Sequence, residues 1–312
     1  MIETTAGTEI RFNQPDPVYR KHPSTSQSEL KEVLRSLAHW QARYGPDAEP
    51  TFPTIAMIMG TALHCKVLEP ELFDGSFVDR SSLDKELTVA ELKAALDEEQ
   101  IDYKKTAKKP ELEALLYPDG KPVDKRTSLS HEDFATVCGM ADALRTHEMT
   151  GRWFDPGRNN YRRANEVSLY VDDLEGLAVK ARIDRLEKTG SGWTILDLKS
   201  TDDASPSAFQ KKAFNLGYHI QAAFYADLVA RVMGCDPEDV DFVFCAVERK
   251  RPHGIAVYKA DQEMIAFGRK QYLKAIRSLA YAKQVDSFPA YPVEMLTLSV
   301  PRWGLASKVD DI

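Results

Sequence analysis

The sequence is poor in cysteine, with four in 312 residues, and none of the four belongs to a CxxC pair. This scatter favours neither a zinc site nor a disulfide framework. Long apolar runs are also missing: none approaches the ~20 residues that a membrane-spanning helix needs, and the first residues lack the basic-then-apolar order of a secretory signal. We therefore expect a cytosolic protein with free thiols and no membrane association.

A net positive charge is lacking too, since the formal charge is −7 at pH 7. This excludes a uniformly basic surface, although a local positive track beside an acidic site is compatible with nucleic-acid binding. The chain is rich in apolar residues, at 43%. That content is sufficient for a well-buried core in one large domain or two ordinary ones.

The first part of the chain predicts an arm followed by helices. Residues 1 to about 25 are polar and contain proline, which is typical of an arm. Ser26 and Glu29 then form a capping-box pattern, and apolar residues at helical spacing continue from Leu30 to Trp40. We expect one helix with a single apolar face there.

A second helix is predicted over about 54–68, because its apolar residues recur at helical spacing and a proline follows its end. Gly60 and His64 lie one turn apart on this helix. We assign residues 1–82 to the arm and to the helical part of the main body.

Residues 83–126 differ in composition from their surroundings and are dominated by Lys, Glu and Asp. Thr88 and Glu91 form a capping box before one short helix, and Pro110 stands where a second helix would begin. The pattern predicts an inserted module consisting of a helix, an extended basic loop and a helix.

Residues 127–312 complete the main body and change from helix to strand. A helix is predicted over about 130–146, and a meander with turns at DLEG and TGSG follows from Glu166. A helix interrupted at Gly217 and ended by Gly234 comes next, then two more strands, and then a long helix over roughly 261–284. This order predicts an α/β or α+β fold with a central mixed sheet flanked by helices.

The TGSG turn predicts how two acidic residues face each other. If the hairpin is symmetric about residues 189–192, opposed residues have numbers that sum to 381, which pairs Asp184 with Asp197. Opposed side chains share one face with β-carbons roughly 5 Å apart, so two carboxylates there would repel each other without a cation between them.

Strand alternation places Lys199 on the same face as Asp197, whereas Leu196 and Leu198 point into apolar packing on the other face. Hard oxygen ligands suit Mg²⁺ or Mn²⁺, and a nearby ammonium can orient an attacking water. A DxK triplet alone is also frequent on half-exposed strands. The ordered set of GxxxH, D, DxK and QxxxY at domain-sized spacings is more specific.

This set resembles the RecB-like nucleases with the PD-(D/E)xK restriction-endonuclease-like fold, and within them the exonuclease VIII (RecE) type. The resemblance covers most of the chain outside the insertion and the first ~15 residues. It is carried by the segments GTALH, KARIDRLE, ILDLKST and GYHIQAAFYAD, together with SQSELKEVLRS near the start.

The resemblance implies specific roles for site residues. It implies a metal held by His64, Asp184, Asp197 and the Leu198 carbonyl, with Lys199 acting on the nucleophilic water. Gln221 and Tyr225, four apart on a predicted helix, share a face that could be directed at the active site or at a DNA phosphate, and coincidental amphipathicity is the alternative. Glu166 is either a support for the metal or an exposed strand-edge acid.

Two basic segments are candidates for DNA contact. The insertion resembles helix-loop-helix modules related to SAP domains, and its alternative is a charged lid or oligomer contact. The second candidate is a predicted hairpin tip. The candidate residues are Lys104, Lys105, Lys108 and Lys109 in the insertion and Arg249, Lys250 and Arg251 at the tip.

The resemblance implies an exodeoxyribonuclease that degrades linear double-stranded DNA from its ends, 5′ to 3′, in recombination or repair in a bacterium or phage. It further implies a ring-shaped homo-oligomer and a single-strand annealing protein as partner. No iron–sulfur cluster is expected, because Cys235 and Cys245 are too far apart. The alternatives are a structure-specific or single-strand nuclease and a catalytically silent DNA-binding protein.

Overall fold

The computed structural model describes residues 4–83, 87–120, 124–154, 163–190 and 192–300. Its centre is a mixed sheet of seven strands in the order β1-β5-β6-β7-β8-β9, with β2 added beside β6. Within this sheet, as far as the structure describes it, the β7/β8 and β2/β6 pairs are parallel and the other pairs are antiparallel. The strands are β1 (Thr8–Arg11), β2 (Thr25–Ser26), β5 (Arg163–Leu174), β6 (Leu177–Thr189), β7 (Gly192–Thr201), β8 (Val240–Glu248) and β9 (Ile255–Lys259).

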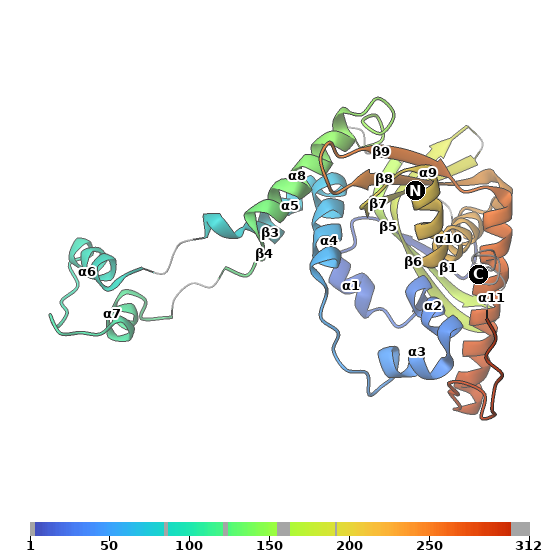
Figure 1. Cartoon of the computed structure of the whole chain (residues 1–312), viewed down its shortest axis with the longest axis horizontal. Coiled ribbons are helices and arrows are strands. Elements are labelled where there is room, and N and C mark those ends of the chain that lie inside the picture. The colour runs from blue at the N-terminus through green and yellow to red at the C-terminus, as the bar shows by residue number, and fades with distance from the viewer. Residues whose placement is uncertain (1–3, 84–86, 121–123, 155–162, 191, 301–312) are drawn as a thin grey trace, which may run out of the picture.

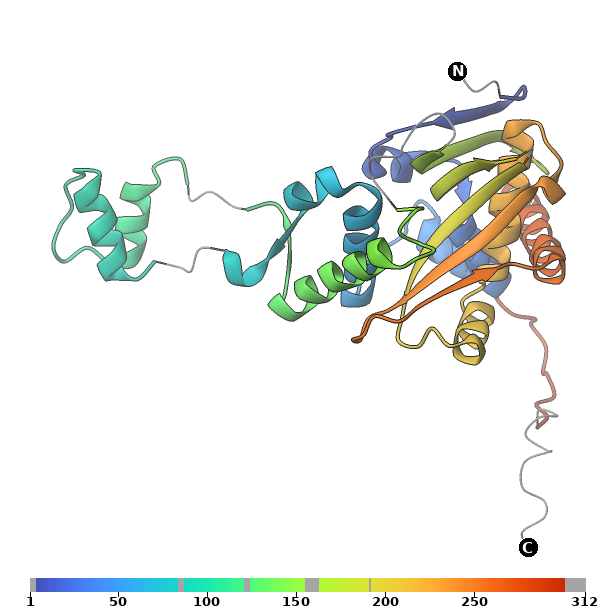
Figure 2. The same cartoon turned by 90° about the horizontal axis from the view of Figure 1, so that it is seen from above.

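Helices cover both faces of this sheet, as Figures 1 and 2 show, so the predicted fold class is confirmed. One face packs against α2 (Gln27–Arg35), α3 (Leu37–Tyr44), α9 (Pro206–Asn215), α10 (Tyr218–Met233) and α11 (Gln262–Val285). The other face packs against α4 (Ile55–Leu68), α5 (Pro70–Ser76) and α8 (His131–Thr146). Within the described part of the chain, no helix has the length and apolarity to cross a membrane.

Several predicted elements have their expected bounds because local signals determine them. The Ser26 backbone N–H donates to the Glu29 carboxylate at 3.0 Å, which is the predicted capping box of α2. The helices expected over about 54–68 and 130–146 are α4 and α8. Capping and apolar spacing act within a few residues, so the sequence alone shows them.

The N-terminal region differs from the prediction in two ways. The arm contains strand β1, which pairs with β5, and the short helix α1 (Asp16–Lys21). The single helix expected after Ser26 is divided, because Ser36 is extended (φ −174°, ψ 159°) and its hydroxyl accepts from the His39 backbone N–H to cap α3. The apolar pattern continues across the break and therefore conceals it.

The segment that was expected to be an insertion contains α6 (Val89–Glu98) and α7 (Lys109–Leu116). They pack on each other around Leu92, Leu96 and Leu112, and every member of this small core lies within the segment (Figure 1, teal). A separate parallel pair, β3 (Phe77–Asp79) with β4 (Thr127–Leu129), joins the chain before and after the segment. Its assignment as a SAP-like module stays a prediction.

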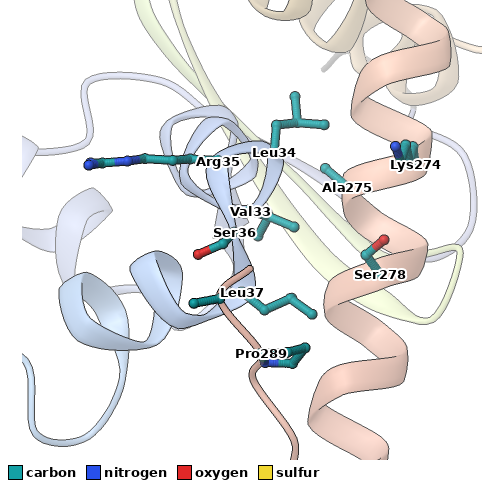
Figure 3. Close-up of a pocket in the computed structure, with 10 residues that line it drawn as sticks. Val33, Leu34, Arg35, Ser36, Leu37, Lys274, Ala275, Ser278 and Pro289 are labelled. Atoms are coloured by element: carbon teal, nitrogen blue, oxygen red, sulfur yellow. The ribbon is translucent and has the colours of Figure 1, made fainter. Parts of the chain in front are cut away.

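A pocket lies between the junction of α2 and α3, helix α11 and the chain after α11 (Figure 3). Leu37 and Pro289 lie on one side of it, and Ala275 and Ser278 of α11 lie on the other. The Pro289 carbonyl accepts a hydrogen bond from the Ala38 backbone N–H, which attaches the C-terminal segment to α3. The predicted metal ligands are not among its lining residues.

Gly268 determines how closely α11 approaches α10. A β-carbon at this position would lie 1.9 Å from the His219 carbonyl oxygen. We expect Gly268→Ala to lower the free energy of unfolding by at least ~1–3 kcal/mol, because the two helices must separate. Urea unfolding measures this change in the free energy of unfolding.

The control is Gly60→Ala, since a β-carbon at position 60 meets nothing within 4 Å. It should be neutral or stabilise the protein by up to ~1 kcal/mol. Equal stabilities of the two variants would contradict the prediction.

Candidate active site

The β6/β7 hairpin has the predicted register. Its pairs run from Arg185 opposite Leu196 to the turn, and each pair of numbers sums to 381. The paired part ends there, one position short of the expected pair of Asp184 and Asp197. Instead, Asp184 Oδ2 accepts a hydrogen bond from the Leu198 backbone N–H at 2.7 Å. The two acids therefore flank the end of the hairpin ladder rather than form a regular cross-strand pair.

An irregularity in the strands accounts for this arrangement. Ile183 and Leu186 are three residues apart but pack in the same core, so the side-chain alternation of β6 shifts between them. On the neighbouring strand β5, Glu166 has a φ of 50°, and the pairing of β5 with β6 omits the position where Glu166 and Asp184 would meet. Non-glycine residues with positive φ are uncommon and are often held at functional sites.

Asp197 on β7 is fixed from two sides. Gln221 on α10 donates its side-chain amide to Asp197 Oδ1 at 2.6 Å, and Lys199 Nζ lies 2.5 Å from Asp197 Oδ2. The Lys199 ammonium also lies 5.1 Å from the centre of the Tyr218 ring. Lys199 and Asp197 thus share a face as predicted, while Leu196 and Leu198 are buried in the opposite core.

His64 on α4 approaches the same place from the other helical layer. Its Nε2 lies 3.0 Å from the Leu198 carbonyl oxygen, and its Nδ1 lies 3.5 Å from Asp184 Oδ1. The Leu198 residue therefore donates its N–H to Asp184 and presents its carbonyl to His64. Four predicted site residues (His64, Asp184, Asp197 and Lys199) from three elements meet around this backbone position.

The charges of these groups depend on one another. Burial lowers the pKa of His64, but the Asp184 carboxylate outweighs it, and the net effect raises this pKa to about 9. Burial works in the opposite sense on Asp184, whose pKa is nevertheless held below its ordinary value by His64 and Lys199. These shifts favour a protonated imidazole beside an ionised carboxylate near neutral pH.

The other two acids have raised pKa values. Burial, with the charge of Asp184 adding to it, raises the pKa of Asp197 to about 6, although Lys199 opposes the shift. Burial and the Asp184 charge likewise raise the pKa of Glu166 to about 7, against the Arg182 guanidinium that is paired with it. Burial is thus the main cause of both raised pKa values, and the charge of Asp184 adds to it.

This set of donors fits a hard divalent cation. One ligand atom each from His64, Glu166 and Asp184 lie within 4.8 Å of one another, and among the described residues this is the single His/Cys/Asp/Glu group of this kind. Asp197 Oδ2 is buried, and despite its nearness to Lys199 it accepts no well-directed hydrogen bond. Carboxylate and carbonyl oxygens are the ligands that Mg²⁺ and Mn²⁺ prefer.

The structure adds Glu166 to the candidate ligands, whereas the sequence analysis predicted either a support for the metal or an exposed strand-edge acid. Glu166 is 9% exposed and is held by Arg182, whose guanidinium also donates to the Gln14 carbonyl oxygen at 2.8 Å. Tyr225 lies one turn after Gln221 and is buried, with its ring packed near Phe242. Burial, followed by the charges of Tyr19 and the site carboxylates, raises the pKa of Tyr225 well above its ordinary value.

The basic candidates lie in different settings. Lys250 and Arg251 are exposed at the β8/β9 hairpin tip, whereas Arg249 is paired with Asp202. This tip lines an open groove together with Ile55 and Met59 of α4, the helix that carries His64. In the α6–α7 segment, Lys104, Lys105 and Lys108 are exposed, and Lys109 lies 3.9 Å from Glu113.

Comparisons with known proteins agree with the arrangement of the fold. A family model described as a PDDEXK-like domain of unknown function (DUF3799) matches residues 26–296. A crystal structure of a “Putative exonuclease” from Eubacterium rectale is similar over 96% of this chain and 100% of its own, with 11% identity and a TM-score of 0.56. At that identity the likeness shows the fold alone.

Two further structures are weakly similar. The structure of SSO0001 matches 70% of this chain and 86% of its own, with 13% identity and a TM-score of 0.26. Protein VC1899 from Vibrio cholerae matches 89% of this chain and 58% of its own, with 12% identity and a TM-score of 0.20. No curated protein matches the sequence.

Proposed function

Because the chain belongs to the PDDEXK-like family matched over residues 26–296, we propose that it is a Mg²⁺- or Mn²⁺-dependent exonuclease that degrades linear double-stranded DNA from its ends. The nuclease chemistry follows from the family, and the substrate, the 5′-to-3′ direction and a role in recombination or repair are our proposal. A ring-shaped homo-oligomer and a single-strand annealing partner in a bacterium or phage belong to the same proposal.

The observation that carries the proposal is the convergence of a complete hydrolytic set at one backbone position. Glu166 and Asp197 supply buried carboxylates, Asp184 supplies a partly buried one, His64 supplies an imidazole, and Lys199 supplies a cation. A catalytically silent DNA-binding protein would have no need to hold three acids and a lysine together against their desolvation cost.

Each side chain has a definable part in this chemistry. His64, Glu166, Asp184, Asp197 and the Leu198 carbonyl would hold the cation. When bound, a divalent cation polarises the phosphate, lowers the pKa of a water and stabilises the leaving oxygen.

The remaining groups orient these ligands and the substrate. Gln221 donates to Asp197 Oδ1 and so fixes that carboxylate while leaving Oδ2 for other partners. Asp184 accepts a hydrogen bond from the Leu198 N–H, which fixes the peptide unit between Asp197 and Leu198, next to the Leu198 carbonyl. Lys199, over the Tyr218 ring, can orient the attacking water and offset the charge of the phosphoryl group.

The test is digestion of linear duplex DNA labelled at either the 5′ or the 3′ end, compared with closed circular DNA, in Mg²⁺, Mn²⁺ or EDTA. We expect metal-dependent release of labelled mononucleotides, first from the 5′-labelled end, while closed circular DNA stays intact. Cleavage of circular or single-stranded DNA would instead support a structure-specific or single-strand nuclease. If the folded protein leaves every DNA intact in both metals, the catalytic proposal is wrong.

Metal binding should release protons. His64, with its pKa raised to about 9, is protonated in the metal-free protein near neutral pH, and only neutral imidazole binds a metal. We expect about one proton to leave per Mn²⁺ bound at pH 7.5. The apparent affinity should therefore increase as the pH rises from 6 to 9.

Calorimetric titration in two buffers of different ionisation enthalpy measures the number of protons released. His64→Gln is the matched variant, since glutamine keeps a polar side chain but has no proton to lose, and it should reduce the number. A binding heat that is the same in both buffers for the unmodified protein would contradict the expectation.

A further inference from the structure

Lys31 lies on α2 and reaches toward the turn between α9 and α10. Its Nζ donates to the Leu216 carbonyl oxygen at 3.0 Å. The Cδ and Cε atoms of its side chain lie 3.4 and 3.5 Å from where a β-carbon on Gly217 would be. Gly217 begins α10 in the left-handed conformation (φ 65°), and the next residue is Tyr218, whose ring lies beneath the Lys199 ammonium. Lys31 and Lys199 therefore contact adjacent residues of one turn.

The ammonium of Lys31 has unused capacity for hydrogen bonds. Among the described residues it has one acceptor, a neutral carbonyl, and no carboxylate within ion-pair distance. Lys180 shows the contrast: its Nζ donates to three carbonyl oxygens at 3.0, 3.1 and 2.6 Å, so its three donors are all used in the fold. The two free donors of Lys31 are not needed by the packing around it.

The electrostatic setting of Lys31 is unfavourable without an anion. Burial, followed by repulsion from the charge of Lys199, lowers the pKa of Lys31 to about 8, although Asp197 opposes this. A half-buried cation with unused donors next to a second cation is stabilised by an incoming anion, which would offset both charges.

We propose that Lys31 binds a backbone phosphate of the nucleic-acid strand whose scissile phosphate lies at Lys199. The inference rests on the proposed function, and it adds a substrate-binding residue from α2, outside the hydrolytic set. Because Lys31 and Lys199 both contact the turn 216–218, they would contact phosphates of the same strand and hold it in register with the metal ligands. Lys31 is in this view a positioning residue for the substrate.

The test compares Lys31→Met with the unmodified protein in binding to a fluorescent duplex, with EDTA present so that cleavage does not occur. Methionine keeps the apolar stem against Gly217 and removes the charge. We expect the dissociation constant to increase roughly tenfold at low salt. The slope of log affinity against log salt should become smaller in magnitude by about 0.9, the value for one lost phosphate contact. Lys283→Met, which removes an exposed lysine lying over the Trp40 ring, is the control and should leave the slope unchanged.

A merely structural role for Lys31 has a different outcome. Loss of the Leu216 contact would displace α10 and with it Gln221, so the affinity for Mn²⁺ would fall. The phosphate contact predicts an unchanged Mn²⁺ affinity, measured by calorimetry. An unchanged salt slope, or a smaller slope together with weaker Mn²⁺ binding, would overturn the proposal.

A second measurement uses the unmodified protein and does not depend on whether the variant folds. Acetylation of lysines by an amine-reactive ester, read by mass spectrometry, should modify Lys31 in the free protein and much less with saturating duplex DNA. Lys283 should react equally in both. Equal modification of Lys31 with and without bound DNA would also overturn the proposal. If the unmodified protein neither binds nor cleaves DNA, the proposed function itself fails.

Discussion

Replacing Asp197 with asparagine is expected to reduce Mg²⁺-dependent DNA cleavage at least about a thousandfold. Asparagine keeps the shape of the side chain and the contact with Gln221, but it removes the charge that a divalent cation needs. A bound metal contributes several kcal/mol to transition-state stabilisation, and each 1.36 kcal/mol is a factor of ten in rate. The same substitution should weaken Mn²⁺ binding in calorimetry.

The control for Asp197→Asn is Asp241→Asn on the neighbouring strand β8. Asp241 is half-buried near the start of β8, and its Oδ1 lies 2.7 Å from Lys259 Nζ. It is not one of the proposed metal ligands. It should keep wild-type cleavage and metal affinity. Rates of nucleotide release from linear duplex DNA at saturating metal measure both variants. Wild-type cleavage by Asp197→Asn would exclude Asp197 from the hydrolytic set.

The sequence predicts the half of the site that depends on strand geometry. A symmetric turn fixes the register of β6 against β7, and alternation then puts Asp197 and Lys199 on one face and the two leucines on the other. These are consequences of a period of two along one hairpin. The turn and the two strands are contiguous in the sequence, so their pattern alone was sufficient to predict the register and the face of each side chain.

The other half depends on contacts that no local pattern contains. Glu166 joins the ligand group because β5 and β6 both depart from regular alternation where Glu166 and Asp184 would pair. No glycine stands at either position, so the sequence does not indicate the irregularity. Lys31 meets Leu216 across 185 residues of sequence. His64 enters from the opposite helical layer, and its role was inferred from the resemblance rather than from its spacing.

Replacing Lys199 with methionine is expected to separate metal binding from chemistry. Lys199 Nζ lies 2.5 Å from Asp197 Oδ2, so the lysine contacts the carboxylate oxygen that the cation would use. Removing the ammonium leaves a buried carboxylate without its nearest positive partner. A divalent cation then binds without competition, and we expect the affinity for Mn²⁺ to increase.

Cleavage by Lys199→Met should nevertheless fall by about 10²–10⁴-fold, the range for losing a group that acts on a proton or on the attacking water. Asp197→Asn and Lys199→Met would thus be similar in activity and opposite in metal affinity. Calorimetry with Mn²⁺, combined with single-turnover digestion of linear DNA, measures the two quantities independently. If Lys199→Met binds Mn²⁺ more weakly than the unmodified protein, the lysine helps to assemble the metal site instead of competing for it, and its assignment to the attacking water loses its support.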